Sequence, residues 1–136
     1  LSGAQLEGAS LEQAHAGAAQ LDRATLIGLR GKQLRAEGAN FTQSDLTNAH
    51  LERSHLREAN FAYATLRKAS LADADCGGAN FTGACLEEAN LQLANLCNCN
   101  WLDTDLRGTI FSGCKLRGAD FCNARLDFAQ FDLAHL

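Results

Sequence analysis

Three groups of side chains in this sequence are of types that do chemistry in proteins. Cys97 and Cys99 form a Cys-Asn-Cys motif among six cysteines, and thiols at short spacing bind metals or form disulfides. The four histidines, which could bind a metal or transfer protons, are His15, His50, His55 and His135. Four acidic residues that concentrate negative charge are Glu87, Glu88, Asp103 and Asp105.

Sequence motifs of catalysis are missing. The chain has no Gly-x-Ser-x-Gly motif, no glycine-rich phosphate loop and no pair of carboxylates that a pocket would bring together. The net charge is only −4 over 136 residues. We therefore expect no enzyme, no catalytic residue and no cofactor.

The residues above are positioned by a five-residue repeat. Every fifth residue from Leu1 is a centre, and of the 28 centres 17 are Leu, six are Phe and one is Trp101. The residue two before each centre is Ala in 19 of 27 cases and is otherwise almost always small. Only Leu29 and Leu34 are large there. Such periodicity determines the fold before local propensities do.

The pattern Ala-x-Leu-x-x, as in AQLEG, ANFTQ and ADFCN, resembles the pentapeptide-repeat family over all 136 residues. The resemblance implies an all-β, right-handed quadrilateral β-helix of about seven coils, each built from four pentapeptides. In that fold the centre and the small residue two before it point inward. We expect one domain, residues 1–136, as a fragment of a longer chain.

A coil of 20 residues gives four walls, numbered 1 to 4 from the centres Leu1, Leu6, Leu11 and Ala16. Wall 1 collects most of the aromatic centres, and wall 2 is Leu throughout. The residues before the wall 1 centres are mostly Asn, which predicts a ladder of stacked amides: Asn40, Asn60, Asn80 and Asn100, closed by Asp120. Nine of the 12 glycines fall two residues after a centre, where we expect a tight turn with positive φ.

Residues 25–40 break the pattern. The centres there are Gly31 and Ala36, and their inward partners are Leu29 and Leu34. We interpret this as an exchange of large and small side chains that keeps the interior volume, which a close-packed core tolerates. A short bulge or loop at this point is the alternative.

The repeat frame argues against reactive cysteines and histidines. The frame places Cys76, Cys99 and Cys114 at inward positions and the other three cysteines at outward positions. Because the thiols then do not converge, we expect neither a disulfide nor a metal site. The four histidines all precede a centre, where polar side chains are exposed. Free thiols favour a cytoplasmic or other reducing compartment, and a secreted effector delivered into a host cell is the alternative.

Some charged columns alternate in sign from coil to coil, which indicates a self-compensated surface. Examples are Arg67, Glu87, Arg107 and Asp127, and also Glu12, Lys32 and Glu52. The family resemblance adds a second hypothesis, because some members inhibit DNA gyrase by imitating DNA. The candidate acidic patch for that role is Glu87, Glu88, Asp103 and Asp105.

Outward apolar residues concentrate after residue 90 and predict a patch that binds a protein partner. The candidate partner-binding patch is Leu93, Ile110, Phe128 and Leu133. Our first hypothesis is therefore a non-enzymatic rigid scaffold of bacterial type. We expect no direct nucleic-acid binding and no membrane span, and the C-terminal end would be covered by a second copy in an end-to-end homodimer or by further coils.

Overall fold

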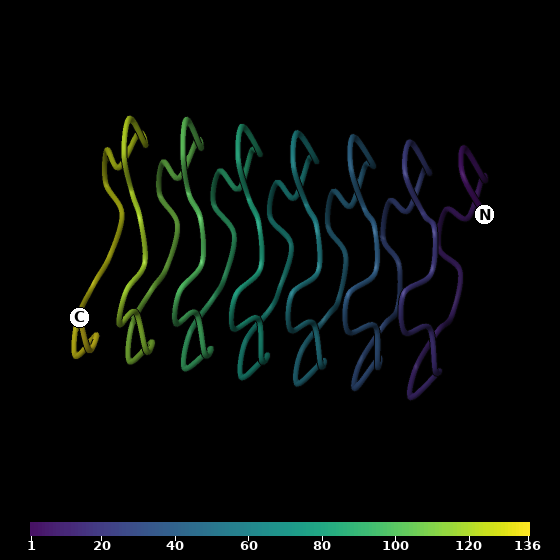
Figure 1. Cartoon of the computed structure of the whole chain (residues 1–136), viewed down its shortest axis with the longest axis horizontal. Coiled ribbons are helices and arrows are strands. Elements are labelled where there is room, and N and C mark those ends of the chain that lie inside the picture. Colours follow the sequence, from purple (N-terminus) through teal and green to yellow (C-terminus); the bar gives the residue numbers. More distant parts are fainter.

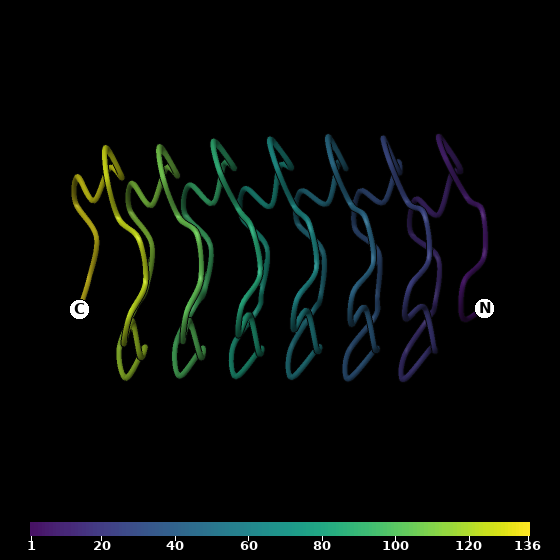
Figure 2. The same ribbon diagram turned by 90° about the horizontal axis from the view of Figure 1, so that it is seen from above.

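The chain forms a right-handed, four-sided β-helix whose coils stack along one axis (Figure 1). The computed structural model describes residues 1–136, and the two termini lie at opposite ends of the rod in both views (Figure 2). Each parallel bridge joins residues 20 apart, from Gln5 and Thr25 to Lys115 and His135. The coil length read from the repeat is thus confirmed. The structure has no helix, and its β structure consists of isolated one-residue bridges.

Each pentapeptide is a short extended segment followed by a turn, as residues 26–30 illustrate. The N–H of Leu29 donates to the carbonyl of Leu26 at 3.0 Å and closes the turn. The N–H groups of Leu26 and Gly28 donate to the next coil at 2.7 and 2.8 Å, and that of Arg30 donates to the previous coil at 2.9 Å. Gly28 has φ of 63°, which a type II turn requires at this position. All nine glycines predicted to have positive φ do so.

In coils that have a neighbour on both sides, the N–H that follows each centre is the one backbone donor without a backbone partner. Where Asn or Asp precedes the centre, its side-chain oxygen accepts this N–H. The Thr47 N–H donates to Asp45 at 3.0 Å, and the Thr82 N–H donates to Asn80 at 3.0 Å. The predicted amide ladder is therefore only partly present. Bonds between amides occur from Asn80 to Asn60, at 3.3 Å, and from Asn40 to Gln20, whereas capping of the turn is the more regular role.

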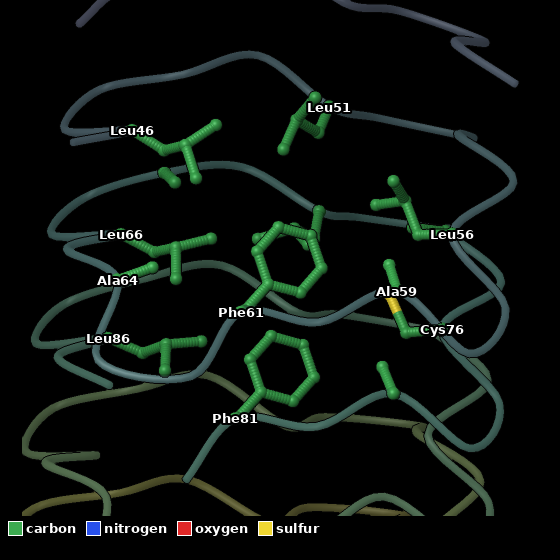
Figure 3. Packing of buried hydrophobic residues seen from close by; sticks show 14 of the residues in the cluster. Leu46, Leu51, Leu56, Ala59, Phe61, Ala64, Leu66, Cys76, Phe81 and Leu86 are labelled. Atoms are coloured by element: carbon green, nitrogen blue, oxygen red, sulfur yellow. The ribbon is translucent and has the colours of Figure 1, made fainter. Parts of the chain in front are cut away.

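The interior is one continuous apolar column of centres and small residues. On wall 1 the rings of Phe41, Phe61, Phe81 and Trp101 are parallel, with successive centroids 4.8, 5.0 and 4.3 Å apart. These distances match the spacing of β strands, about 4.8 Å, so the rings stack at the rise of the coil. Figure 3 shows Phe61 and Phe81 stacked between the leucines of wall 2 and Cys76 of wall 4.

Residues 25–40 continue the coil without interruption. Leu29 and Leu34 are fully buried, and the bridges of Arg30 and Arg35 to both neighbouring coils are intact. A Cβ at Gly31 would lie 3.6 Å from Cδ2 of Leu29, so the leucine fills the space beside the glycine. The exchange of sizes is confirmed, and the alternative of a bulge is wrong.

Candidate functional site

Three of the six cysteines are part of the core. Cys76, Cys99 and Cys114 are buried and no cysteine is in a disulfide. The Cys99 thiol donates to the carbonyl of Cys76 at 3.1 Å, and the Cys114 thiol donates to the carbonyl of Leu91 at 2.8 Å. Burial raises the pKa of Cys99 to about 12 and that of Cys114 to about 11, and it raises the pKa of Cys76 well above the usual range. Because a thiolate is the reactive form, these thiols are structural.

Serine and threonine occupy some of the inward positions where alanine usually stands, and their hydroxyl groups are buried there. Ser54 donates to the carbonyl of Gly31 at 2.9 Å, and Thr104 donates to the carbonyl of Phe81 at 3.0 Å. Ser54 and Thr104 thus bond to the backbone of the preceding coil, whereas Ser44 donates to the carbonyl of Phe41 in its own coil at 2.6 Å and the buried indole N–H of Trp101 has no partner. The hydrogen bonds between coils made by these residues satisfy their buried hydroxyl groups.

The Cys-Asn-Cys motif does not converge, because Cys99 is buried while Cys97 is partly exposed. His50 lies 3.5 Å from Glu52 on wall 3, and His15 and His55 flank Arg35 on wall 4. His135 belongs to the last coil and bridges to Lys115. Groups of three or more His, Cys, Asp or Glu with the geometry of a metal site do not occur in the structure.

The four acidic residues lie on neighbouring coils, and three of them are paired with cations. Glu87 contacts Arg67 at 2.6 Å and Arg107 at 3.4 Å, and Glu88 lies 3.5 Å from Lys68. Glu87 and Glu88 are therefore compensated by cations from adjacent coils.

Asp105 forms an ion pair with Arg107 through both of its carboxylate oxygens. Arg107 donates to both carboxylate oxygens of Asp105 at 2.8 Å, and Arg125 lies 3.7 Å away. These hydrogen bonds and charges hold the pKa of Asp105 below its ordinary value. Asp103 accepts a hydrogen bond from Asn123 at 3.1 Å.

The alternating columns form only in part. Arg67, Glu87 and Arg107 alternate as the sequence predicts, but Asp127 makes no ion pair because Arg107 turns to Asp105 within its own pentapeptide. In the second column Glu52 pairs with His50, and no ion pair joins it to Lys32.

The apolar residues predicted as a patch lie on wall 3 and its two corners. Phe128 is 90% exposed, Leu133 is 87% exposed and Leu93 is 58% exposed, whereas Ile110 is partly buried. Gly113 stands between Leu93 and Leu133 in the same column, and a Cβ there would lie 2.7 Å from Cδ2 of Leu93. The side chain of Leu93 thus extends over Gly113 toward Leu133. Phe128 borders the charged network beside Gly108 and Arg107.

The largest hollow was not predicted from the sequence. It has a volume of about 470 Å³, is shallow and open, and lies at the corner between walls 3 and 4 in the first three coils. Its lining is entirely polar and consists of Gln13, His15, Gln33, Arg35, Arg53 and His55. Two columns of period 20 contain all six residues, so the signal was available in the sequence. We refer to this feature as the polar hollow.

The C-terminal end of the rod is an open apolar surface. A hollow of about 280 Å³ there is lined by Phe121, Leu126, Phe131, Ala134 and Leu136. The backbone N–H groups of Phe121, Leu126 and Phe131, which pair with the next coil elsewhere, have no partner at this edge.

Coils of four pentapeptides with apolar centres, type II turns and a filled interior define a class of β-helical solenoids. The sequence model described as pentapeptide repeats matches in eight copies, over residues 1–30, 37–73, 59–96, 74–113, 89–127 and 102–136. The chain therefore belongs to the pentapeptide repeat family. The matched ranges leave out residues 31–36, where the large and small inward residues are exchanged.

Solved structures of the same fold resemble the chain. A pentapeptide repeat protein from the thylakoid lumen of Arabidopsis thaliana is 26% identical, with a TM-score of 0.58 over 77% of this chain and 70% of that one. QnrB1, a plasmid-mediated fluoroquinolone resistance protein, is 19% identical, with a TM-score of 0.50 over 96% of this chain and 78% of that one. The likeness to QnrB1 concerns the fold alone. A comparison with curated protein sequences finds no match.

The structure contains no helix, and therefore none that is long and apolar enough to cross a membrane.

Proposed function

We propose that this chain is a non-enzymatic, rigid scaffold that binds a protein partner through Leu93, Ile110, Phe128 and Leu133. The interior is filled by side chains, so the outer walls and corners carry the binding surfaces. A rod held by hydrogen bonds between all neighbouring coils presents such a surface with little loss of conformational entropy on binding.

The observation that carries the proposal is the exposure of three large apolar side chains on one wall. Phe128 and Leu133 project from the two corners of wall 3 in the last coil, and Leu93 reaches toward Leu133 over Gly113. Exposing such side chains together is unfavourable in water, and contiguous apolar surface is typical of interaction sites. The partner that fits has an apolar contact surface, with polar groups at its edge where Phe128 adjoins the charged network.

The proposal is tested by replacing the apolar side chains and comparing partners. The triple variant Leu93→Ser, Phe128→Ser, Leu133→Ser removes the patch, while Tyr63→Ser removes an exposed aromatic residue on another corner. Proximity labelling in the source cell, followed by binding measurements with each purified candidate, should show partners that wild type and Tyr63→Ser bind and the triple variant does not. Equal affinity of all three proteins for every partner would contradict the proposal.

A DNA-mimicking inhibitor of gyrase is the second candidate function, and the arrangement of charge does not favour it. Glu87, Glu88 and Asp105 are paired with cations, so no continuous acidic wall is present. We expect no inhibition of DNA supercoiling by gyrase at stoichiometric protein. Potent inhibition that is lost when Glu87, Glu88, Asp103 and Asp105 are neutralised together would establish the second candidate instead.

We further propose that the open C-terminal end is covered, either by a second copy or by a further coil. Its apolar lining and unpaired N–H groups are the groups that a stacked coil would satisfy. Sedimentation of the chain tests the first possibility, because Leu136→Asp and Leu126→Asp should dissociate an end-to-end dimer.

A further inference from the structure

The polar hollow lies at the end of the rod opposite to the apolar patch and has a different chemical character. Its wall 4 column is His15, Arg35 and His55, which are joined by parallel bridges and are therefore spaced at the rise of one coil. The adjacent corner column is Gln13, Gln33 and Arg53. Six side chains of hydrogen-bonding type thus face one hollow from three successive coils.

The side chains of the polar hollow are not hydrogen-bonded to one another or to the rest of the protein. None of its six side chains makes a hydrogen bond to another protein group, whereas the Asn and Asp residues on the same wall in later coils are bonded. Arg35 lies 3.6 Å from Glu37, and Arg53 lies 3.8 Å from Asp73. Both distances exceed the 2.7–2.9 Å, roughly, of a charge-assisted hydrogen bond, so the guanidinium donors remain available.

Backbone N–H groups add to these donors. On wall 4 the residue before the centre is His15, Arg35 or His55 in the first three coils, and none of them caps the turn. The N–H groups of Gly17, Glu37 and Arg57 consequently have no acceptor. In the next coil Asp75 accepts the corresponding N–H of Gly77 at 3.3 Å, which shows that such an N–H points toward the side chain before the centre.

These groups indicate the chemistry of a ligand. Two guanidinium groups and a row of backbone N–H groups bind an oxyanion, and guanidinium matches phosphate geometry. Gln13 and Gln33 both donate and accept, as the recognition of hydroxyl groups requires. Because no apolar side chain lines the hollow, its lining favours a ligand with hydroxyl groups over an apolar one.

We propose that the polar hollow is a binding site for a small phosphorylated sugar. The phosphate is held by Arg35, Arg53 and the N–H groups of Glu37 and Arg57, and the sugar hydroxyl groups are bound by Gln13 and Gln33. The volume of about 470 Å³ accommodates a ligand of this size. The carboxylates nearest to the arginines, Glu37 and Asp73, repel an anionic ligand and limit its affinity.

The test is a titration of the full chain with glucose 6-phosphate, with inorganic phosphate and with glucose, each at constant ionic strength. Binding is monitored through the backbone and side-chain amide signals in ¹H–¹⁵N spectra. Glucose 6-phosphate should shift the amides of Gly17, Glu37 and Arg57 and the side-chain amides of Gln13 and Gln33. The double variant Arg35→Gln, Arg53→Gln should weaken binding at least about tenfold, since each charged hydrogen bond that is lost changes affinity strongly.

Two controls separate specific binding from general attraction of anions. Arg117→Gln removes the same charge at an exposed site in a distant coil and should leave the dissociation constant within about twofold. Gln13→Ala with Gln33→Ala should abolish the preference for glucose 6-phosphate over inorganic phosphate. All five substituted positions are exposed, and an unchanged thermal midpoint verifies that the variants are folded.

Each outcome decides the matter. A saturable response that follows the arginines supports the proposal. The proposed site is wrong if no saturable response occurs, or if Arg117→Gln weakens binding as much as the double variant of Arg35 and Arg53. Inorganic phosphate that binds as tightly as glucose 6-phosphate overturns the assignment of a sugar ligand.

Discussion

Leu29→Ala tests the exchange of large and small residues most directly. Leu29 is fully buried, so the substitution removes three carbon atoms from the core. At about 0.8 kcal/mol per buried methylene, the transfer of these atoms accounts for roughly 2.4 kcal/mol. The cavity that remains beside Gly31 adds to this value, and we expect a total loss of about 3 to 5 kcal/mol in the free energy of unfolding.

Gly31→Leu in the Leu29→Ala background should recover much of this loss. A Cβ at Gly31 would lie 2.8 Å from Cδ2 of Leu51, which is the flexible end of a side chain, and 3.6 Å from Cδ2 of Leu29, which the first substitution removes. Gly31 does not have positive φ, so a side chain is compatible with its backbone. Gly31→Leu alone should destabilise, because Leu29 then still fills the space.

The four proteins form a double-mutant cycle that urea denaturation measures. We expect a coupling energy on the order of 2 kcal/mol in favour of the double variant, since the two sites share one space. Leu133→Ala, at an exposed position, is the control and should change stability by less than about 0.5 kcal/mol. Additive effects within about 0.5 kcal/mol would refute the idea that the two positions exchange volume.

Two further predictions concern the core. Phe81→Ala should cost about 3 to 5 kcal/mol, because the ring is buried and stacked 5.0 Å from Phe61 and 4.3 Å from Trp101, and an unchanged thermal midpoint would contradict the aromatic stack. Stability should also fall at alkaline pH. Because the folded-state pKa values of Cys76, Cys99 and Cys114 are raised above the ordinary value of 9.0, their contribution is fully present below pH 9 and is lost as the pH rises above it. Urea midpoints at pH 8 and pH 10 measure this loss, and equal midpoints would show that the three thiols are not protected.

The repeat predicted the fold in detail because one physical requirement recurs every five residues. Burial of each centre determines the coil, and the period of 20 then predicts the aromatic stack, the inward cysteines and the size exchange at Leu29. The role of Asn80 was only partly predicted, since a column of amides indicates a ladder. Its role as a cap becomes evident only when the single unpaired N–H of the turn is identified.

Side-chain partners on the surface were predicted less well than the core. The repeat places two acidic residues next to Arg107, Asp105 in the same pentapeptide and Asp127 in the next coil. The structure selects Asp105 because the two side chains leave the same pentapeptide on the same side and meet through two hydrogen bonds. The polar hollow was missed for a related reason. His15 and His55 were considered as single exposed residues, whereas the hollow arises from two adjacent columns taken together.

A repeat protein distinguishes its surfaces by local departures from the repeat, because every pentapeptide has the same backbone. Two departures stand out in this chain, the row of His15, Arg35 and His55 on wall 4 and the apolar corners at Phe128 and Leu133. The first lies in coils of residues 1–60, and the second lies in coils of residues 81–136. Substitutions at sites that share no contacts have additive effects. Arg35→Gln with Arg53→Gln should therefore leave partner binding unchanged, and the triple variant of the apolar patch should still bind the phosphorylated sugar.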